Sequence, residues 1–172
     1  MSRLRKLVGL WIVVVAYIGG PVAYYFAVRW LDGALGLPTL MSAQIGALFA
    51  ALSFFAGLFW ASWAYSHLHF VGGGSPVEAF GMALEPTKRL VTTGPYAYTR
   101  NPMLIGFLFL LLAGALYADS ISGVALIPIL ALVAMLYIRR FEEPALVRRL
   151  GKRYEDYREA VPALIPSIRP RV

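Results

Sequence analysis

The residues best suited to chemistry lie in two short polar segments that flank an apolar hairpin. In the first segment, Arg100, Asn101 and Pro102 stand directly before a long apolar run. Asn is a favoured N-cap and Pro suits the first helical position, so the pattern predicts a helix that begins at Pro102. The free N–H groups and the positive dipole end of such a helix can hold a carboxylate. The same pattern also fits a capped helix without any ligand.

The second segment carries two adjacent carboxylates, Glu142 and Glu143, directly after another apolar run. Positions beside a membrane-spanning helix usually favour Lys and Arg, so an acidic pair there is unusual. The two carboxylates can neutralise nearby arginines, namely Arg100, Arg139 or Arg140, or they can bind the ammonium group of a ligand. The residues alone leave both interpretations open.

Other polar residues give weaker indications of chemistry. His67 and His69 are two positions apart, so on a helix they point to different faces and make a poor metal-binding pair. The chain has no cysteine, which excludes a thiol nucleophile and a cysteine metal site. The glycine-rich segment 72–76 lacks the Gly-Lys-Ser/Thr ending of a phosphate-binding loop and is predicted to be a linker. We therefore expect no metal site.

The composition places both polar segments in a membrane protein. Of the 172 residues, 59% are hydrophobic, and the mean hydropathy is +0.67. A soluble domain of this size cannot bury that much apolar surface. The net charge of +7 indicates either nucleic acid or an anionic membrane surface as a partner. Because the basic residues flank long apolar runs, we expect the lipid bilayer and no nucleic acid.

Four apolar runs are candidates for transmembrane helices, since a hydrocarbon core ~30 Å thick needs roughly 20 helical residues. The runs cover residues 7–30, 40–65, 102–118 and 121–138, and only Asp119 and Ser120 separate the last two. The predicted fold is all-α, a polytopic membrane protein with about four transmembrane helices. The first run is too long for a signal peptide, so we expect it to be retained.

Charge predicts the orientation of these spans. In a four-span arrangement, every Lys and Arg except Arg29 lies on one side of the membrane. Cytoplasmic loops carry the excess of basic residues, so we expect both termini and both polar segments on the cytoplasmic side. We divide the single membrane domain 1–172 into two N-terminal spans (1–69), a cytoplasmic linker (70–101), a helical hairpin (102–141) and a cytoplasmic tail (142–172).

The tail is predicted to contain an amphipathic helix. One helical face carries apolar and aromatic residues, namely Leu146, Leu150, Tyr154, Tyr157 and Val161. Gly151 interrupts the pattern and weakens a helix by about 1 kcal/mol relative to Ala. We therefore expect a break in the helix at Gly151.

The order of motifs along the chain resembles the isoprenylcysteine carboxyl methyltransferase and phospholipid N-methyltransferase superfamily. The resemblance covers about 90–166 and rests on an ordered set: Leu90-Val91-Thr92-Thr93-Gly94-Pro95-Tyr96, Arg100-Asn101-Pro102-Met103, Gly106, a transmembrane hairpin, Glu142-Glu143-Pro144, Leu150-Gly151, Tyr154, Tyr157, Val161-Pro162 and Ile165-Pro166. It implies a fold in which the motifs on either side of the hairpin meet at the cytoplasmic membrane face.

The resemblance also implies a cofactor, S-adenosylmethionine, and the residues that bind it. Leu90, Val91, Tyr96 and Arg100 would line the cofactor pocket. The start of the third span, Asn101, Pro102, Met103 and Leu104, would place amides near the methionine carboxylate. Glu142 or Glu143 would hold the methionine ammonium, and residues after Gly151 would cover the adenosine.

The acceptor implied by the resemblance is lipophilic and resembles an isoprenylcysteine carboxylate or a phospholipid. Arg139, at the mouth of the fourth span, is a candidate to orient an anionic acceptor. The superfamily often has His where this chain has Asn101 and Tyr where it has Leu104. Asn cannot act as an imidazole base, which puts any mechanism that needs a base there in doubt. An ionised carboxylate or thiolate acceptor needs no base.

Two other functions remain open at this point. A membrane reductase similar to the steroid 5α-reductases would share the Tyr, Val-Pro and Ile-Pro pattern of the tail and would bind NADPH. An acidic pair is an awkward neighbour for a polyanionic dinucleotide, so the motif set favours the methyltransferase. The other alternative is a non-catalytic membrane scaffold. Transport is disfavoured because the spans carry almost no charged residues.

Overall fold

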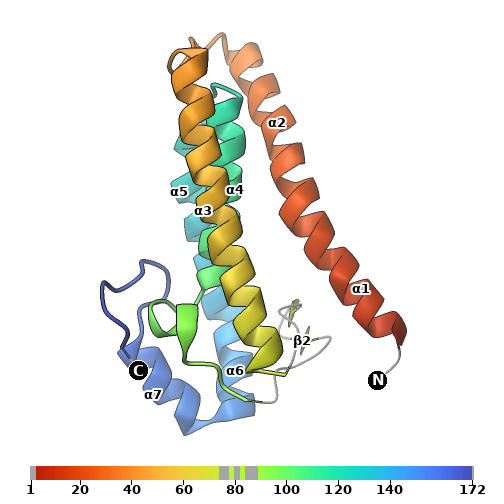
Figure 1. Cartoon of the computed structure of the whole chain (residues 1–172), viewed down its shortest axis with the longest axis vertical. Coiled ribbons are helices and arrows are strands. Elements are labelled where there is room, and N and C mark those ends of the chain that lie inside the picture. Colours follow the sequence, from red (N-terminus) through yellow and green to blue (C-terminus); the bar gives the residue numbers. More distant parts are fainter. Residues whose placement is uncertain (1–2, 74–77, 80–81, 84–88, 172) are drawn as a thin grey trace.

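The computed structural model describes residues 3–73, 78–79, 82–83 and 89–171 (Figure 1). The described elements are helical apart from one short antiparallel pairing of β1 (Glu78–Ala79) with β2 (Met82–Ala83). The helical elements are α1 (Arg3–Val14), η1 (Val15–Gly19, a π-helical turn), α2 (Gly20–Leu35), α3 (Ala43–Phe70), η2 (Gly94–Ala97, a 3₁₀ turn), α4 (Pro102–Tyr117), α5 (Ile121–Tyr137), η3 (Ile138–Glu142, a π-helical turn), α6 (Glu143–Leu150) and α7 (Lys152–Ala160).

Three described helices are long and apolar enough to cross a membrane, and they confirm the predicted all-α membrane fold. They cover Trp11–Leu35, Ala43–Phe70 and Ile121–Leu150, and their outer faces expose many large apolar side chains. The fourth apolar helix, Pro102–Tyr117, has 16 residues. At a rise of 1.5 Å per residue it is about 24 Å long, shorter than the hydrocarbon core.

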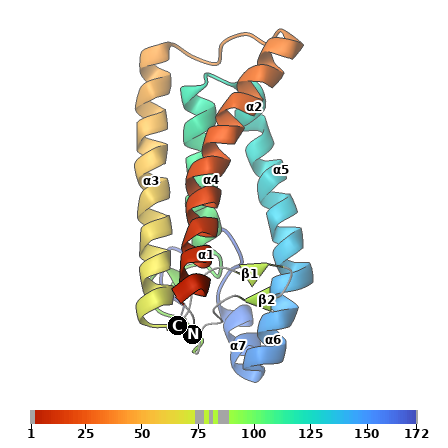
Figure 2. The ribbon, with the colours of Figure 1, turned by 90° about the vertical axis from the view of Figure 1, so that its right-hand side faces the viewer.

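The short helix α4 lies at the centre of the bundle. It contacts α2, α3 and α5, and these helices surround it in Figure 2. Its buried side chains include Ile105, Leu110 and Leu111. The neighbouring spans shield α4, so it does not need the full length of a lipid-facing helix.

Small residues bring α3 and α4 into close contact. A Cβ on Gly106 would lie 2.7 Å from the amide nitrogen of Ala61, and a Cβ on Gly57 would lie 2.9 Å from the carbonyl oxygen of Gly106. The Ser53 hydroxyl donates to the Phe109 carbonyl across the same interface at 2.9 Å. Membrane helices associate through such backbone approaches, since lipid gives no hydrophobic driving force between them.

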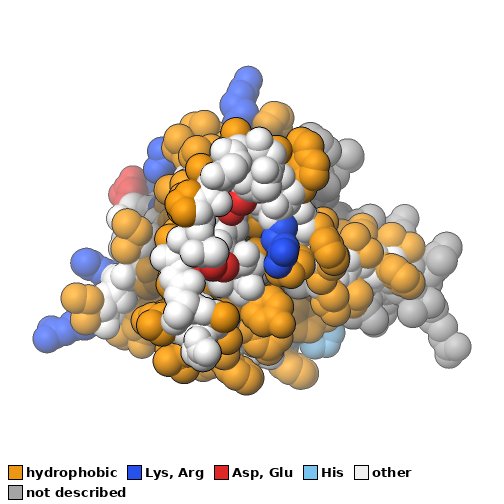
Figure 3. All heavy atoms as spheres, turned by 90° about the horizontal axis from the view of Figure 1, so that it is seen from above, with side chains coloured by type: hydrophobic (Ala, Val, Ile, Leu, Met, Phe, Trp, Pro, Cys, Tyr) orange, Lys and Arg blue, Asp and Glu red, His pale blue; other side chains and the backbone are white. Residues whose placement is uncertain are grey.

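Two carboxylates hold the turns at the end of the bundle away from the tail. Asp119, with φ of 56°, accepts hydrogen bonds from the amides of Leu40 and Met41, both at 2.9 Å. Asp32 accepts from the Ser122 amide at 3.1 Å. Viewed from this end, acidic side chains lie near the centre beside a basic one, with hydrophobic side chains around them (Figure 3). The tight turn predicted between the third and fourth spans is confirmed.

The fourth span is longer than the predicted range, 121–138. It continues without a break through η3 into α6 and ends at Leu150. Proline lacks the N–H that an α-helix needs and its ring clashes with the carbonyl four residues earlier, which for Pro144 is that of Arg140. The π-helical turn directly before Pro144 widens the helix and relieves this conflict.

The predicted break at Gly151 is confirmed. Its backbone angles are φ 61° and ψ −143°, which end α6 and turn the chain into α7. Only glycine adopts this conformation readily. Of the predicted glycine-rich linker, residues 74–76 lie outside the described part of the chain, and so does Lys88 from the orientation argument.

Candidate functional site

The loop before α4 and the tail after α6 meet at the end of the bundle opposite Asp119 (Figure 1). The loop turns through η2, where Gly94 has φ of 59°. A Cβ on Gly94 would lie 2.2 Å from Nε2 of His67, so glycine is needed for both the conformation and the close contact. This turn places the residues after Gly94 against the end of α3.

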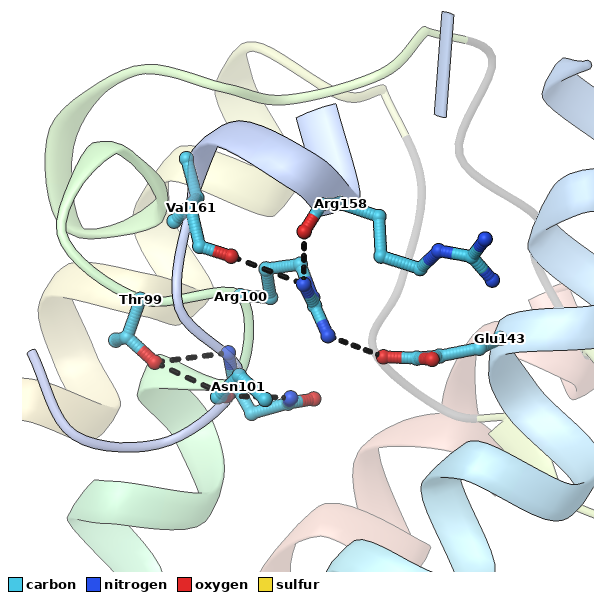
Figure 4. A network of polar contacts seen from close by, with 7 residues as sticks. Thr99, Arg100, Asn101, Glu143, Arg158 and Val161 are labelled. Atoms are coloured by element: carbon cyan, nitrogen blue, oxygen red, sulfur yellow. Dashed lines mark hydrogen bonds and ion pairs between the residues drawn. The ribbon is translucent and has the colours of Figure 1, made fainter. Parts of the chain in front are cut away.

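Arg100 joins the loop to the tail through four hydrogen bonds (Figure 4). Its Nη2 donates to Oε1 of Glu143 at 2.7 Å, and the two side chains are only 10% and 9% exposed. Its Nη1 donates to the carbonyls of Arg158 and Val161, the latter at 2.9 Å. Its backbone amide donates to the Pro162 carbonyl at 2.9 Å. The guanidinium therefore pairs with the start of α6 and caps the end of α7.

One donor of Arg100 is left open. Its Nε is buried and has no hydrogen-bond partner within the described part of the chain. A buried charged N–H without a partner costs free energy, and such groups in native proteins call for an explanation. This donor is the clearest indication of a missing anionic or polar partner beside the Arg100–Glu143 pair.

Asn101 occupies the predicted N-cap position of α4, but its side chain does not cap the helix. Its Nδ2 instead donates to the Ala163 carbonyl at 2.8 Å. The expectation of a side-chain cap was wrong, because the Asn101 side chain lies against the tail and bonds Ala163 instead of its own helix. The first amides of α4, including those of Met103 and Leu104, therefore receive no cap from Asn101.

Thr99 is fully buried and fastens the same part of the tail. Its Oγ1 contacts the Ala163 and Leu164 carbonyls at 3.2 and 3.1 Å, and accepts from the Asn101 amide at 3.3 Å. The sequence analysis assigned no role to Thr99. Thr hydroxyls commonly bond nearby backbone groups, and this was the signal in the sequence for a structural role of Thr99.

Apolar residues of the loop pack in two groups. Val91 and Tyr96 pack with Ala64 of α3, and Met103 of α4 lies against them. Leu90 packs instead on the buried face of the tail, which comprises Tyr154, Tyr157 and Val161 with Leu146, Val147 and Leu150 around them. The predicted apolar face of the tail is thus confirmed.

Buried phenols line this junction and stay neutral. The Tyr157 hydroxyl donates to the Tyr96 carbonyl at 2.8 Å, which ties α7 to η2. Burial raises the pKa of Tyr96, Tyr154 and Tyr157 well above the ordinary value of 10.0. At neutral pH these groups are hydrogen-bond donors and cannot serve as bases.

The fold brings most predicted site residues together. Arg100, Asn101 and Glu143 meet in one network, and of the three arginines considered for the acidic pair, Arg100 is the partner of Glu143. Glu142 is half-buried one residue before Glu143, whereas Arg139 is exposed on η3. No group of His, Cys, Asp and Glu that could hold a metal ion occurs among the described residues.

Comparison with known proteins gives one match. A protein-family model described as phospholipid methyltransferase matches residues 45–153, from the start of α3 into α7. The chain matches no curated protein and no solved structure in these comparisons. The matched region contains both polar segments and leaves the first span outside.

Proposed function

The chain belongs to the phospholipid methyltransferase family, and from this premise we propose that it transfers a methyl group from S-adenosylmethionine to a lipophilic acceptor. Family membership and the long apolar helices make it an integral membrane methyltransferase. The observation that carries the proposal is the Arg100–Glu143 pair, which joins the two halves of the motif at one end of the bundle. In this proposal residues 1–172 act as one membrane domain.

The charges at this junction suit the two ends of the methionine group of S-adenosylmethionine. Its carboxylate would accept from Nε of Arg100, the donor without a partner among the described residues, and from the first amides of α4. Its ammonium would lie against Glu142 or against Glu143. Because Oε1 of Glu143 already accepts from Arg100, a bound ammonium has to use the other oxygen or Glu142.

Apolar residues would form the rest of the cofactor pocket. Leu90, Val91 and Tyr96 would line it from the loop, with Pro102 at the start of α4 beside them, and the segment after Gly151 would cover the adenosine. This cover is already folded onto the loop through Asn101, Thr99 and Tyr157. A cover of this kind excludes water from the reacting atoms.

The bound cofactor would supply an activated methyl group on a sulfonium. The chain would hold the methyl donor and the acceptor in the right orientation. Holding donor and acceptor in line can contribute several powers of ten to the rate. The Asn101 amide group donates to Ala163, and the buried phenols have a pKa raised above their ordinary range. Neither can take a proton at neutral pH. The acceptor would therefore arrive as a nucleophile or lose its proton to solvent.

The acceptor would come from the bilayer, as an isoprenylcysteine-like carboxylate or a phospholipid-like head group. Arg139 is exposed on η3, directly after the apolar run of α5, and would orient an anionic head group there. A series of acceptors with one head group and increasing chain length tests this step. Rates should rise with chain length, because each buried CH₂ contributes up to about 0.8 kcal/mol. A flat series would contradict a lipophilic acceptor.

Titration of S-adenosylmethionine against the protein in detergent tests the cofactor assignment. Glu142→Gln combined with Glu143→Gln keeps the size of both side chains and removes their charges, and a hydrogen bond to a charged group contributes roughly 1.5–3 kcal/mol. We expect the affinity to fall at least tenfold. Asp156→Asn is the matched control, because Asp156 is exposed on α7. Binding of NADPH in place of S-adenosylmethionine would contradict the proposal and favour the reductase alternative.

A further inference from the structure

Tyr17 is the residue through which the first span reaches the candidate site. It lies in η1, a π-helical turn in the middle of a membrane-spanning helix, and outside the matched residues 45–153. A π-helical turn inserts an extra residue into the helix, changes the direction of the side chains that follow and occurs often at functional sites. Pro21 follows η1 by two residues, as Pro144 follows η3, so both π-helical turns accommodate a proline.

The phenol of Tyr17 contacts the first turn of α4. Its hydroxyl donates to the Met103 carbonyl at 2.8 Å, and its ring meets the Phe107 ring edge-on with centroids 5.6 Å apart. Gly20, one turn further along, makes room for Phe107, because a Cβ there would lie 3.3 Å from that ring. In lipid, a phenol must find an acceptor within the protein. Tyr17 finds it two residues after Asn101.

Tyr17 is linked to Tyr96 through Met103, whose carbonyl accepts from Tyr17 and whose side chain packs against the cluster that contains Tyr96. Burial is the main cause of the raised pKa of Tyr96, and the neighbouring phenols of Tyr157 and Tyr17 raise it further. Tyr96 is 8% exposed, and its carbonyl accepts the hydrogen bond from Tyr157. Tyr96 is therefore linked to the tail through Tyr157 and to the first span through Tyr17.

The first span leaves the bundle just before Tyr17. Helix α2 packs on α4 and α5, whereas α1 diverges from them toward the end that carries the tail (Figures 1 and 2). The side chains of Trp11, Ile12 and Val15 are exposed along this part. Tyr17 is therefore the residue that fastens the diverging helix to the start of α4.

We propose that Tyr17 is a positioning residue for the start of α4, where the first amides would hold the carboxylate of the cofactor. By bonding Met103 and packing on Phe107, it fixes this turn of α4 beside the loop and the tail. The first span would thereby set how well the cofactor is held. This inference rests on the proposed function.

Tyr17→Phe tests the inference because it removes only the hydroxyl. Tyr24→Phe is the matched control: Tyr24 lies in the same span and donates to the Gly123 carbonyl of α5, at 2.5 Å. We expect Tyr17→Phe to weaken the affinity for S-adenosylmethionine at least fivefold and to leave the acceptor KM, measured at saturating cofactor, within twofold. Tyr24→Phe should leave both quantities within twofold. Melting temperatures of both variants show whether loss of stability alone explains a change.

An unchanged affinity for S-adenosylmethionine in Tyr17→Phe, or an equal loss in both variants, would overturn the inference. If the wild-type protein transfers no methyl group to any lipid, the proposed function fails, and this is seen before the variants are compared. In that case, hydrogen exchange in detergent still tests whether Tyr17 positions the start of α4. Faster exchange of the first amides of α4 in Tyr17→Phe, but not in Tyr24→Phe, supports the positioning role, and equal exchange in the two overturns it.

Discussion

At the scale of single residues, the site depends on a buried ion pair that serves structure and leaves a donor free. Arg100 satisfies three carbonyls of the tail and one carboxylate, and its Nε remains without a partner in the described residues. Its backbone amide bonds the Pro162 carbonyl, and its guanidinium bonds the other three acceptors. Lysine could not replace it, because a single ammonium cannot reach these three acceptors in the planar geometry of a guanidinium. The contacts with the tail therefore explain an arginine at this position.

Substitution of Arg100 alone should lower stability more than substitution of both Arg100 and Glu143. Arg100→Gln leaves the buried Glu143 carboxylate unpaired, and breaking a buried pair costs about 3–5 kcal/mol. We expect a clear fall in melting temperature in detergent for Arg100→Gln, and partial recovery in Arg100→Gln/Glu143→Gln. A double-mutant cycle measures this coupling. If the single and double variants lose the same stability, the pair is not coupled and its role in joining loop and tail is contradicted.

The buried phenols of the tail predict a loss of stability at alkaline pH. The pKa values of Tyr154 and Tyr157 lie above 10.0 in the folded tail, mainly because of burial. Below about pH 10 the phenols are neutral in both folded and unfolded chains, so stability is unaffected. Above it, the unfolded phenols ionise first, and each lowers stability by up to about 1.4 kcal/mol per pH unit.

Thermal unfolding in detergent between about pH 9 and 11 measures this loss. Tyr154→Phe should give a shallower pH dependence, because it removes one of the titrating groups. It leaves intact the hydrogen bond from Tyr157 to the Tyr96 carbonyl. An unchanged slope in this variant would contradict the assignment of the alkaline transition to the tail.

At the scale of elements, the site depends on how closely α3 and α4 pack. Helix α3 carries the end against which the Gly94 turn is placed, and α4 carries the start that holds Asn101. The two helices approach at Gly57 and Gly106, where backbone atoms are in contact. Any change that separates them moves the loop relative to the tail.

Gly106→Ala should therefore disrupt both stability and cofactor binding. The added Cβ would meet backbone atoms of Ala61 and Gly57 at 2.7 and 2.9 Å, which cannot move aside as a flexible side chain can. Overpacking of this kind costs about 1–3 kcal/mol or more. Gly33→Ala is the control, since a Cβ there meets nothing within 4 Å. We expect a lower melting temperature for Gly106→Ala only, and equal values would show that the helices separate at little cost.

At the scale of the whole molecule, the described charges divide between the two ends of the bundle. Asp32 and Asp119 hold the turns at one end, and the Arg100 network holds the tail at the other. The arginines that follow α5 belong to the second end. This distribution supports the proposal that the site and both termini face the cytoplasm.

Single cysteines test the proposed orientation without background, because the chain has none. Cysteine at Lys152, which is exposed on α7, should react with a membrane-impermeant reagent from the cytoplasmic face. Cysteine at Leu37, exposed in the turn between α2 and α3, should react from the opposite face. A cysteine at Ser2 should behave like that at Lys152. Labelling of positions 2 and 152 from opposite faces would contradict an even number of spans.

The sequence by itself determined the features that depend on neighbouring residues. The apolar runs gave the helices, Pro102 gave the start of α4, and Gly151 gave the break between α6 and α7. Helix formation, proline geometry and glycine backbone freedom act over a few residues, so a single sequence contains the information. The order of the motifs also led to the correct family.

Only the tertiary structure decided which distant groups meet. Glu143 pairs with Arg100 rather than with Arg139 or Arg140, and the Asn101 side chain bonds Ala163, 62 residues away, instead of its own helix. Tyr17 reaches Met103 from a span that carries none of the motifs. A side chain bonds whichever acceptor the packed helices place within about 3 Å, and that choice depends on helix crossings and bends that no local pattern encodes.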